Sequence, residues 1–188
     1  RNFNSQNAFA SGMKQSTGDA VILLDGDLQD PPELIESFYK KWNEGYEVVY
    51  GSRVEREASF LMNFAYKTFY RLFNKFSYLD IPLDAGDFSL MDRKVVDAIN
   101  NTSETDRFIR GLRAWVGFKQ IGVPYKRSER LFGTSTNNLF KNINWAKKGI
   151  FSFSYFPLEF LSLFSYLIVL LSAVALLVYI VFYFLYPG

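Results

Sequence analysis

The last part of the chain contains a long run without charge, and this run constrains the architecture more than any other feature. From Phe160 through Tyr186 no residue is charged, a stretch of about 27 residues where about 20 are enough to span a bilayer. Leucine, isoleucine, valine and phenylalanine recur on every side of the helix that this run predicts. Tyr179 and Tyr183 near the far end resemble the aromatic belt of a membrane interface. We therefore predict a transmembrane segment at 157–188, the alternative being a buried helix of a soluble protein.

The segment before this run has an amphipathic pattern. Within 139–150, the apolar residues share one face of a helix and the lysines lie mostly opposite, which is typical of a helix in the headgroup layer of a membrane. Lys141, Lys147 and Lys148 precede the predicted span and no basic residue follows it. The positive-inside rule then places the preceding domain in the cytoplasm. We expect an integral membrane protein with an amphipathic juxtamembrane helix and linker at 138–156.

The first 137 residues alternate helix and strand patterns. Helical spacing over 7–15 is followed by an apolar, β-branched run at 20–24, which predicts a buried strand. Asp30, two prolines and Glu33 predict the capped start of a second helix, and a short strand follows at 47–51. This order predicts a layered α/β domain with a mainly parallel sheet.

Four further elements are expected before the amphipathic segment. The aromatic, helical pattern of 59–76 fits either a helix lying on a membrane or a helix facing the core. A strand is expected at 88–91, followed by a helix capped by Asp92. Residues 105–115 favour another helix, and 119–125 an edge strand.

Composition excludes several kinds of chemistry. The 188 residues include no Cys and no His, so the chain has no disulfide, thiolate nucleophile or imidazole base. The net charge of +2 gives no general sign of nucleic-acid binding. Any reaction must therefore use carboxylates, Lys, Arg, Tyr, Ser or Thr.

The strand at 20–24 ends in two acidic residues, Asp25 and Asp27, on either side of a glycine. Ligands of α/β sheets bind at the carboxyl ends of strands. Carboxylates are the ligands that Mg²⁺ or Mn²⁺ prefers, and such an ion usually completes its shell with substrate phosphates. The triplet therefore indicates a metal and diphosphate site, although a polar turn closing a strand would have the same residues.

The longer motif around this triplet resembles the polyprenyl-phosphate glycosyltransferases of glycosyltransferase family 2, which include bactoprenol glucosyltransferases and dolichyl-phosphate mannose synthases. The resemblance extends over nearly the whole chain because further motifs follow in the same order. These motifs are Asp25-Gly26-Asp27-Leu28-Gln29-Asp30-Pro31-Pro32-Glu33, Arg1-Asn2-Phe3 with Gly12, Tyr50-Gly51-Ser52-Arg53, Phe69-Tyr70-Arg71-Leu72, Ile81-Pro82-Leu83-Asp84-Ala85-Gly86-Asp87-Phe88, Arg107-Phe108-Ile109-Arg110-Gly111-Leu112 and Arg130-Leu131-Phe132-Gly133-Thr134-Ser135.

The resemblance implies a GT-A fold and metal-dependent, inverting transfer of a sugar from a nucleotide sugar to a polyprenyl phosphate. Asp25 and Asp27, with Gln29 as a third candidate, would hold Mg²⁺ or Mn²⁺ against the diphosphate. Arg53 and the adjacent Ser52 would bind the acceptor phosphate, although Arg53 could equally form a surface ion pair.

The resemblance also places the loop of Asp84 and Asp87 beside the reacting centre. Asp87 is the candidate base and Asp84 the reserve, but the acceptor phosphate is already anionic near neutral pH, since a phosphate monoester has a second pKa of about 6. Asp87 could instead orient a substrate, or both carboxylates could satisfy loop amides. Arg107 and Arg110 are predicted to be structural.

A basic loop supplies the predicted contacts to the donor diphosphate. These residues are Arg127, Arg130, Gly133 and Ser135. Arg130 is the better match to the family's diphosphate-contacting arginine, and Gly133 would let the backbone approach the phosphates. The same basic loop could bind anionic lipid headgroups.

We therefore predict a partial GT-A catalytic domain at 1–137 facing the cytoplasm, with the bacterial plasma membrane as the favoured location. UDP-glucose and undecaprenyl phosphate are the favoured substrates, and the lipid bilayer is a partner. The sequence leaves open whether the protein forms a homo-oligomer. Transfer of mannose, N-acetylglucosamine or an amino sugar, processive polysaccharide extension, and a non-catalytic membrane scaffold are the alternatives. Compared with the family, we expect the first strands, which bind the nucleotide base, and a second span to be missing, so that this chain is a fragment.

Overall fold

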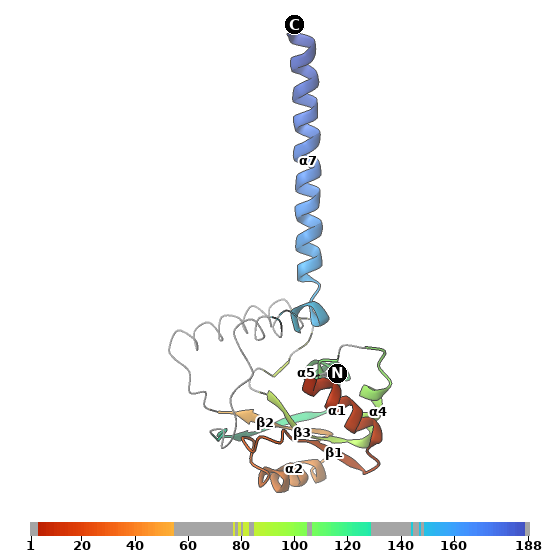
Figure 1. Ribbon diagram of the computed structural model, residues 1–188, viewed down its shortest axis with the longest axis vertical. Helices are drawn as coiled ribbons and strands as arrows, with labels where there is room; N and C mark the ends of the chain where they lie inside the picture. The colour runs from red at the N-terminus through yellow and green to blue at the C-terminus, as the bar shows by residue number, and fades with distance from the viewer. Residues whose placement is uncertain are drawn as a thin grey trace.

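The computed structural model describes residues 4–54, 77, 79, 81–82, 85–104, 107–128, 144, 147 and 149–186. These residues form an α/β domain with helices on both faces of one sheet, and a single long helix projects from the domain (Figure 1). The α/β class predicted from the sequence is confirmed. The predicted helix at 59–76 and most of the predicted amphipathic helix lie outside the described residues.

The sheet in the described part of the chain has four strands in the order β1-β3-β2-β4. Their bounds are Ala20–Leu23 for β1, Val48–Arg53 for β2, Ala85–Asp92 for β3 and Gln120–Tyr125 for β4. Strands β1, β2 and β4 run in one direction, but β3 lies between β1 and β2 and is antiparallel to both. The expectation of a mainly parallel sheet is therefore wrong, because β3 forms antiparallel pairs with both β1 and β2. The reason is that β3 starts at the edge where β2 ends and runs back between the two earlier strands.

Three helices cover one face of the sheet and one covers the other. Helices α1 (Asn4–Gln15), α4 (Arg93–Asn100) and α5 (Ile109–Trp115) pack on the first face. Helix α2 (Leu34–Asn43) packs on the second face, where the rings of Phe38 and Phe88 lie 4.7 Å apart. Adjacent residues of β2 face opposite layers, with Val48 in the first and Val49 in the second. Both faces are thus buried, which explains why the strands are apolar without clean alternation.

The ends of helices α2 and α4 show which of the predicted capping residues are correct. Asp92 caps α4, because its side chain accepts a hydrogen bond from the backbone N–H of Lys94 at 3.1 Å. Gly45 follows α2 with a φ of 92°, a conformation that glycine adopts without strain. The predicted cap at Asp30 is wrong, since Glu33 precedes α2 and Asp30 is buried elsewhere.

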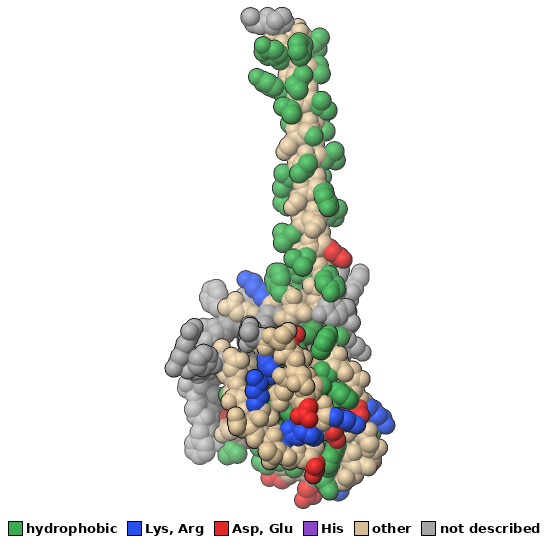
Figure 2. Space-filling model, turned by 90° about the vertical axis from the view of Figure 1, so that its right-hand side faces the viewer, with side chains coloured by type: hydrophobic (Ala, Val, Ile, Leu, Met, Phe, Trp, Pro, Cys, Tyr) green, Lys and Arg blue, Asp and Glu red, His purple; other side chains and the backbone are tan. Residues whose placement is uncertain are grey.

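Helix α7 (Phe156–Leu185) has 30 residues, with proline in its first turn and no buried side chain. At 1.5 Å per residue it is about 45 Å long. It is the one helix in the described part of the chain that is long and apolar enough to cross a membrane. Apolar side chains cover its visible face in Figure 2. The predicted C-terminal helix is confirmed.

Residues just before α7 dock on the α/β domain. Residues 149–153 are helical, and Phe153 is only 5% exposed. Its ring lies so close to Gly111 of α5 that a Cβ at this glycine would be 2.0 Å from the ring atom Cε2. The Ser77 hydroxyl donates a hydrogen bond to the Phe153 carbonyl at 3.1 Å. The base of α7 is thereby fixed to helix α5.

Candidate active site

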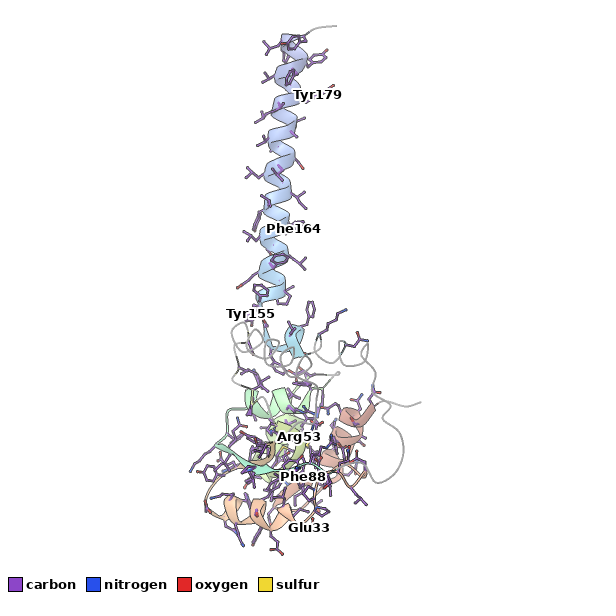
Figure 3. The ribbon with its side chains drawn as sticks, turned by 90° about the vertical axis from the view of Figure 1, so that its left-hand side faces the viewer. Glu33, Arg53, Phe88, Tyr155, Phe164 and Tyr179 are labelled. Atoms are coloured by element: carbon purple, nitrogen blue, oxygen red, sulfur yellow. The ribbon has the colours of Figure 1, made fainter. Side chains whose placement is uncertain are left out.

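The charged residues predicted from the sequence gather at one edge of the sheet. The carboxyl ends of β1, β2 and β4 lie there with the amino end of the reversed strand β3. These ends carry Asp25 and Asp27, Arg53, Arg127 and Asp87. In Figure 3, Arg53 lies on the α7 side of Phe88, and Glu33 lies at the opposite end of the domain. Of the labelled residues of the domain, Arg53 therefore lies nearest the base of the long helix.

Asp30 forms the buried centre of this edge, with 1% of its surface exposed. The Tyr125 hydroxyl donates a hydrogen bond to Asp30 Oδ1, and Arg127 Nε lies 3.3 Å from the same oxygen. Arg53 Nη2 lies 3.9 Å from it, and Arg53 Nε donates to the Tyr125 hydroxyl oxygen at 3.2 Å. Burial, and then the hydrogen bond to Asp30, raise the pKa of Tyr125 to about 12. One buried carboxylate thus holds two arginines beside each other.

The acidic loop after β1 is tied to the loop after β4. Asp27 Oδ1 accepts a hydrogen bond from the Gln29 backbone N–H at 3.2 Å, and Asp27 Oδ2 lies 3.8 Å from Arg127 Nη2. Gln29 exchanges two hydrogen bonds with the backbone of Ser128, at 3.1 and 3.3 Å. Between these residues, Leu28 has a φ of 57°, which is uncommon for a residue with a side chain. The loop is thus held in a constrained shape.

Asp25 has more negatively than positively charged groups around it. Its pKa is raised by burial first, then by the carboxylates of Asp87, Asp27 and Asp30, while Arg127 lowers it. A divalent cation would relieve this repulsion. No group of three or more Asp or Glu side chains among the described residues is arranged to hold a metal. Asp25 and Asp27 would thus supply at most one or two carboxylate ligands to an ion, and substrate phosphates would have to complete its shell.

Asp87, the candidate base, is 9% exposed at the start of β3. Arg110 binds it through two atoms, with Nε donating to Oδ1 at 3.0 Å and Nη2 donating to Oδ2 at 3.2 Å. Gln6 Nε2 donates to Oδ2 at 3.1 Å. Burial opposes ionisation, but the charge and hydrogen bonds of Arg110, followed by the charge of Arg113, hold the pKa of Asp87 below its usual range.

The remaining predicted residues divide into two groups. Ser52 pairs with Ala85 of β3 and Pro124 of β4, next to a register shift in β2. Arg127 is close to two acidic residues, as described above. Asp84, Arg130, Gly133 and Ser135 lie outside the described residues, so their predicted roles stay predictions.

Five residues of the site were not identified as site residues from the sequence, and one of them is Asp30, which was predicted only as a helix cap. Gln6, Arg110 and Arg113 surround Asp87, and Tyr125 lies between Arg53 and Asp30. Arg110 was predicted to be only structural. Tyr125 had one usable signal, namely its place at the carboxyl end of a strand, but Gln6 had none, because it is a polar residue in a polar helix.

Comparison with known proteins supports the class that this geometry indicates. The family model "Glycosyl transferase family 2" matches residues 1–100. The chain belongs to this family of glycosyltransferases.

Three similar proteins indicate which group of this family the chain resembles. The chain is 47% identical over 163 residues to "Uncharacterized glycosyltransferase YkcC" of Bacillus subtilis, covering 86% of this chain and 50% of the relative. It is 42% identical over 160 residues to the "Bactoprenol glucosyl transferase" of Shigella phage SfX, covering 85% of this chain and 52% of that protein. The "Putative glycosyltransferase CsbB" of Bacillus subtilis is 36% identical over 174 residues, at 93% and 53% coverage. The predicted resemblance to the polyprenyl-phosphate group is confirmed, and the chain spans about half the length of these curated relatives.

Proposed function

We propose that the protein containing this chain transfers a sugar, with glucose favoured, from a nucleotide sugar to a polyprenyl phosphate at the cytoplasmic face of a membrane. The observation that carries this proposal is the meeting of an acidic loop with two arginines at one sheet edge. Asp25 and Asp27 supply cation ligands, and Arg53 and Arg127 supply charge for phosphate groups. A donor diphosphate and an acceptor phosphate need both kinds of group close together.

The metal ion has a defined place in this proposal. Asp25 and Asp27, with Gln29 as the third candidate, would hold Mg²⁺ or Mn²⁺. The bound ion would supply Lewis acidity that stabilises negative charge on the departing nucleotide. The carboxylates of this chain supply the negative potential that attracts the ion, as the raised pKa of Asp25 indicates.

The arginines differ in how they are held. Arg53 Nη2 lies beside Gly86, where an added Cβ would be 3.1 Å from it, so a side chain at this position would require the guanidinium to shift by a few tenths of an ångström. A planar guanidinium fixed in this way can bind a phosphate through two nitrogens. We assign Arg53, with Ser52, to the acceptor phosphate, and Arg127, with Arg130, Gly133 and Ser135, to the donor diphosphate.

The membrane explains how a lipid acceptor reaches the site. Helix α7 is apolar and has no buried side chain, so in water it would expose a long apolar surface. We propose that α7 spans the bilayer and that Phe153 fixes the domain against its base. The phosphate of a membrane-embedded polyprenol would then lie on the α7 side of the domain, and Arg53 lies on that side of Phe88 (Figure 3). Helix α7 contains no Lys or Arg, which agrees with a membrane span, and Lys141, Lys147 and Lys148 before it agree with a cytoplasmic catalytic domain.

The test is sugar transfer by the full-length protein. Radiolabelled UDP-glucose is incubated with undecaprenyl phosphate and Mg²⁺, and the lipid product is counted after extraction. Asp27→Ala is expected to lower turnover by at least about 100-fold, because metal stabilisation of the leaving charge is worth several kcal/mol. Asp19→Ala is the matched control, because Asp19 is an exposed acidic residue at the other end of β1.

The outcomes separate the alternatives. Chelation of the metal should abolish transfer, and the anomeric configuration of the product tests inversion. Transfer from mannose or N-acetylglucosamine donors, but not from UDP-glucose, would change the sugar assignment alone. Wild-type turnover in Asp27→Ala would refute the proposed site, and no transfer from any donor would favour a non-catalytic scaffold.

A further inference from the structure

Gln6 is a buried polar residue in a helix whose other polar side chains are mostly exposed. It is 4% exposed in the first half of α1. A buried amide is costly unless its hydrogen-bonding groups are paired. Gln6 Oε1 accepts a hydrogen bond from the backbone N–H of Ile109 at 2.9 Å, and Gln6 Nε2 donates to Asp87 Oδ2 at 3.1 Å. One side chain therefore joins α1, β3 and α5.

The orientation of the Gln6 amide is determined by its partners. Ile109 is the first residue of α5, and its N–H can only donate. No side chain caps this helix end from the preceding residue, Phe108. The Gln6 oxygen must therefore face Ile109, which directs the NH₂ group at Asp87. Gln6 satisfies the helix end and positions the carboxylate with the same amide group.

The Asp87 carboxylate is fixed from two directions. Arg110 of α5 binds both of its oxygens, and Gln6 of α1 binds Oδ2. A carboxylate has about four acceptor positions, and three are occupied by these described residues, which leaves one on Oδ1. The carboxylate cannot rotate without breaking several hydrogen bonds at once.

Other positive charges around Asp87 favour its ionised form. Arg113 of α5 is 1% exposed and lies over the Tyr50 ring at 5.0 Å. Arg53 of β2 lies beside Gly86, and within the described part of the chain Asp25, in the loop after β1, opposes the negative charge of Asp87. A general base works best when its pKa is near the operating pH. A carboxylate held as an anion by several cations lacks this property.

We propose that Gln6 is a positioning residue of this site, which together with Arg110 holds Asp87 in one orientation as a fixed hydrogen-bond acceptor for substrate. Asp87 then orients a hydroxyl group of the donor sugar, which donates to the Oδ1 position that these contacts leave open, and it removes no proton. The acceptor phosphate needs no base, since it is anionic near neutral pH. This inference rests on the proposed function, because it concerns the same reaction.

The experiment compares Gln6→Leu and Gln6→Glu in the full-length protein over a range of pH. Gln6→Leu removes both hydrogen bonds and is expected to lower kcat about ten- to 100-fold, the effect of one charge-assisted hydrogen bond, with KM for the nucleotide sugar little changed. In Gln6→Glu the protonated carboxyl can still donate to Asp87 and accept from Ile109. Burial and the nearby Asp87 raise the pKa of the introduced carboxyl. Its kcat should be near wild type in acid and fall as pH rises.

Gln15→Leu and Gln15→Glu are the matched controls, since Gln15 is an exposed glutamine of the same helix. Both should keep wild-type kcat and pH dependence. If Gln6→Leu keeps wild-type kcat, or if Gln6→Leu and Gln6→Glu have the same pH profile, Gln6 has only a structural role and the inference is overturned.

A second measurement requires no turnover. The ¹³C signal of the Asp87 carboxyl, assigned by its loss in Asp87→Asn, should report an ionised carboxylate at neutral pH and should shift in Gln6→Leu but not in Gln15→Leu. If the wild-type protein transfers no sugar, the proposed function fails, while an unchanged carboxyl signal in Gln6→Leu would separately refute the positioning role.

Discussion

Replacing Gly111 by alanine tests how the segment before α7 is attached to the domain. A Cβ at this position would lie 2.0 Å from Cε2 and 2.3 Å from Cζ of Phe153, and 2.8 Å from Cδ1 of Phe108. Carbon atoms prefer separations of about 3.5–4.0 Å. The Phe153 ring must therefore move by about 1.5 Å or leave its site.

The expected change in the free energy of unfolding caused by Gly111→Ala is the sum of two opposing effects. Overpacking of a fitted site costs about 1–3 kcal/mol. Alanine in place of glycine inside a helix gains about 1 kcal/mol, so Gly111→Ala is expected to destabilise the wild-type protein slightly. In a Phe153→Ala background the two contacts with Phe153 are absent and only the 2.8 Å contact with Phe108 is left, so the same change should cost less or stabilise by up to about 1 kcal/mol. The effect of Gly111→Ala should therefore become more favourable in this background, with a coupling of about 1–3 kcal/mol between positions 111 and 153.

The assay is unfolding of the four proteins of this double-mutant cycle in detergent, followed by tryptophan fluorescence. Trp115 is a useful reporter because it lies in α5, as Gly111 does. Hydrogen exchange of the peptide containing Phe153 should increase in Gly111→Ala. Gly12→Ala is the matched control, since a Cβ at this α1 glycine meets nothing within 4 Å, and it should stabilise both backgrounds equally. Equal stabilisation by Gly111→Ala in both backgrounds would refute the docking of Phe153.

Two further predictions concern the buried charges. Asp87→Asn should destabilise the protein by about 3–5 kcal/mol, because Arg110 and Arg113 lose their buried counter-charge. Because the folded pKa of Asp87 is lowered from 3.8, its contribution is present above this pH and lost as pH falls through the folded value, so the stability gap between wild type and Asp87→Asn should close in acid. A constant gap down to acid unfolding would contradict the ion pair. Tyr125→Phe should cost about 1–3 kcal/mol, because buried Asp30 loses a donor. The pKa of Tyr125 is raised from 10.0 to about 12, so its contribution is present below pH 10 and lost as pH rises through the folded value. The Tm difference should therefore shrink between pH 10 and 12, and a difference that grows would refute this assignment.

Local features of the sequence predicted the strands and the acidic loop well. The apolar run at 20–24 identifies a buried strand, and Asp25 and Asp27 must follow it wherever the strand lies. Asp92 and Gly45 are also local, because a cap or a turn depends on neighbours within a few residues.

Long-range partners were not predictable in the same way. Asp30 has the sequence context of a helix cap, but Tyr125, far along the chain, offers a buried hydrogen bond that replaces this role. The contact between Gln6 and Asp87 joins residues 81 positions apart. The direction of β3 is likewise not encoded in its own residues, because an apolar strand covered on both faces has the same pattern in either direction.

The position of β3 has a consequence for synthesis of the protein. Leu90 pairs with both Ile22 of β1 and Val49 of β2, so the two earlier strands are joined only through this later one. A nascent chain that has emerged only through β2 therefore holds two apolar strands whose β3-facing edges are unpaired, and such edges are templates for aggregation. Closing the sheet requires strands that are far apart in sequence to pair, which slows folding. A ribosome that stalls before residue 85 should release an aggregation-prone product, whereas continued translation through β3 protects both strands in one step.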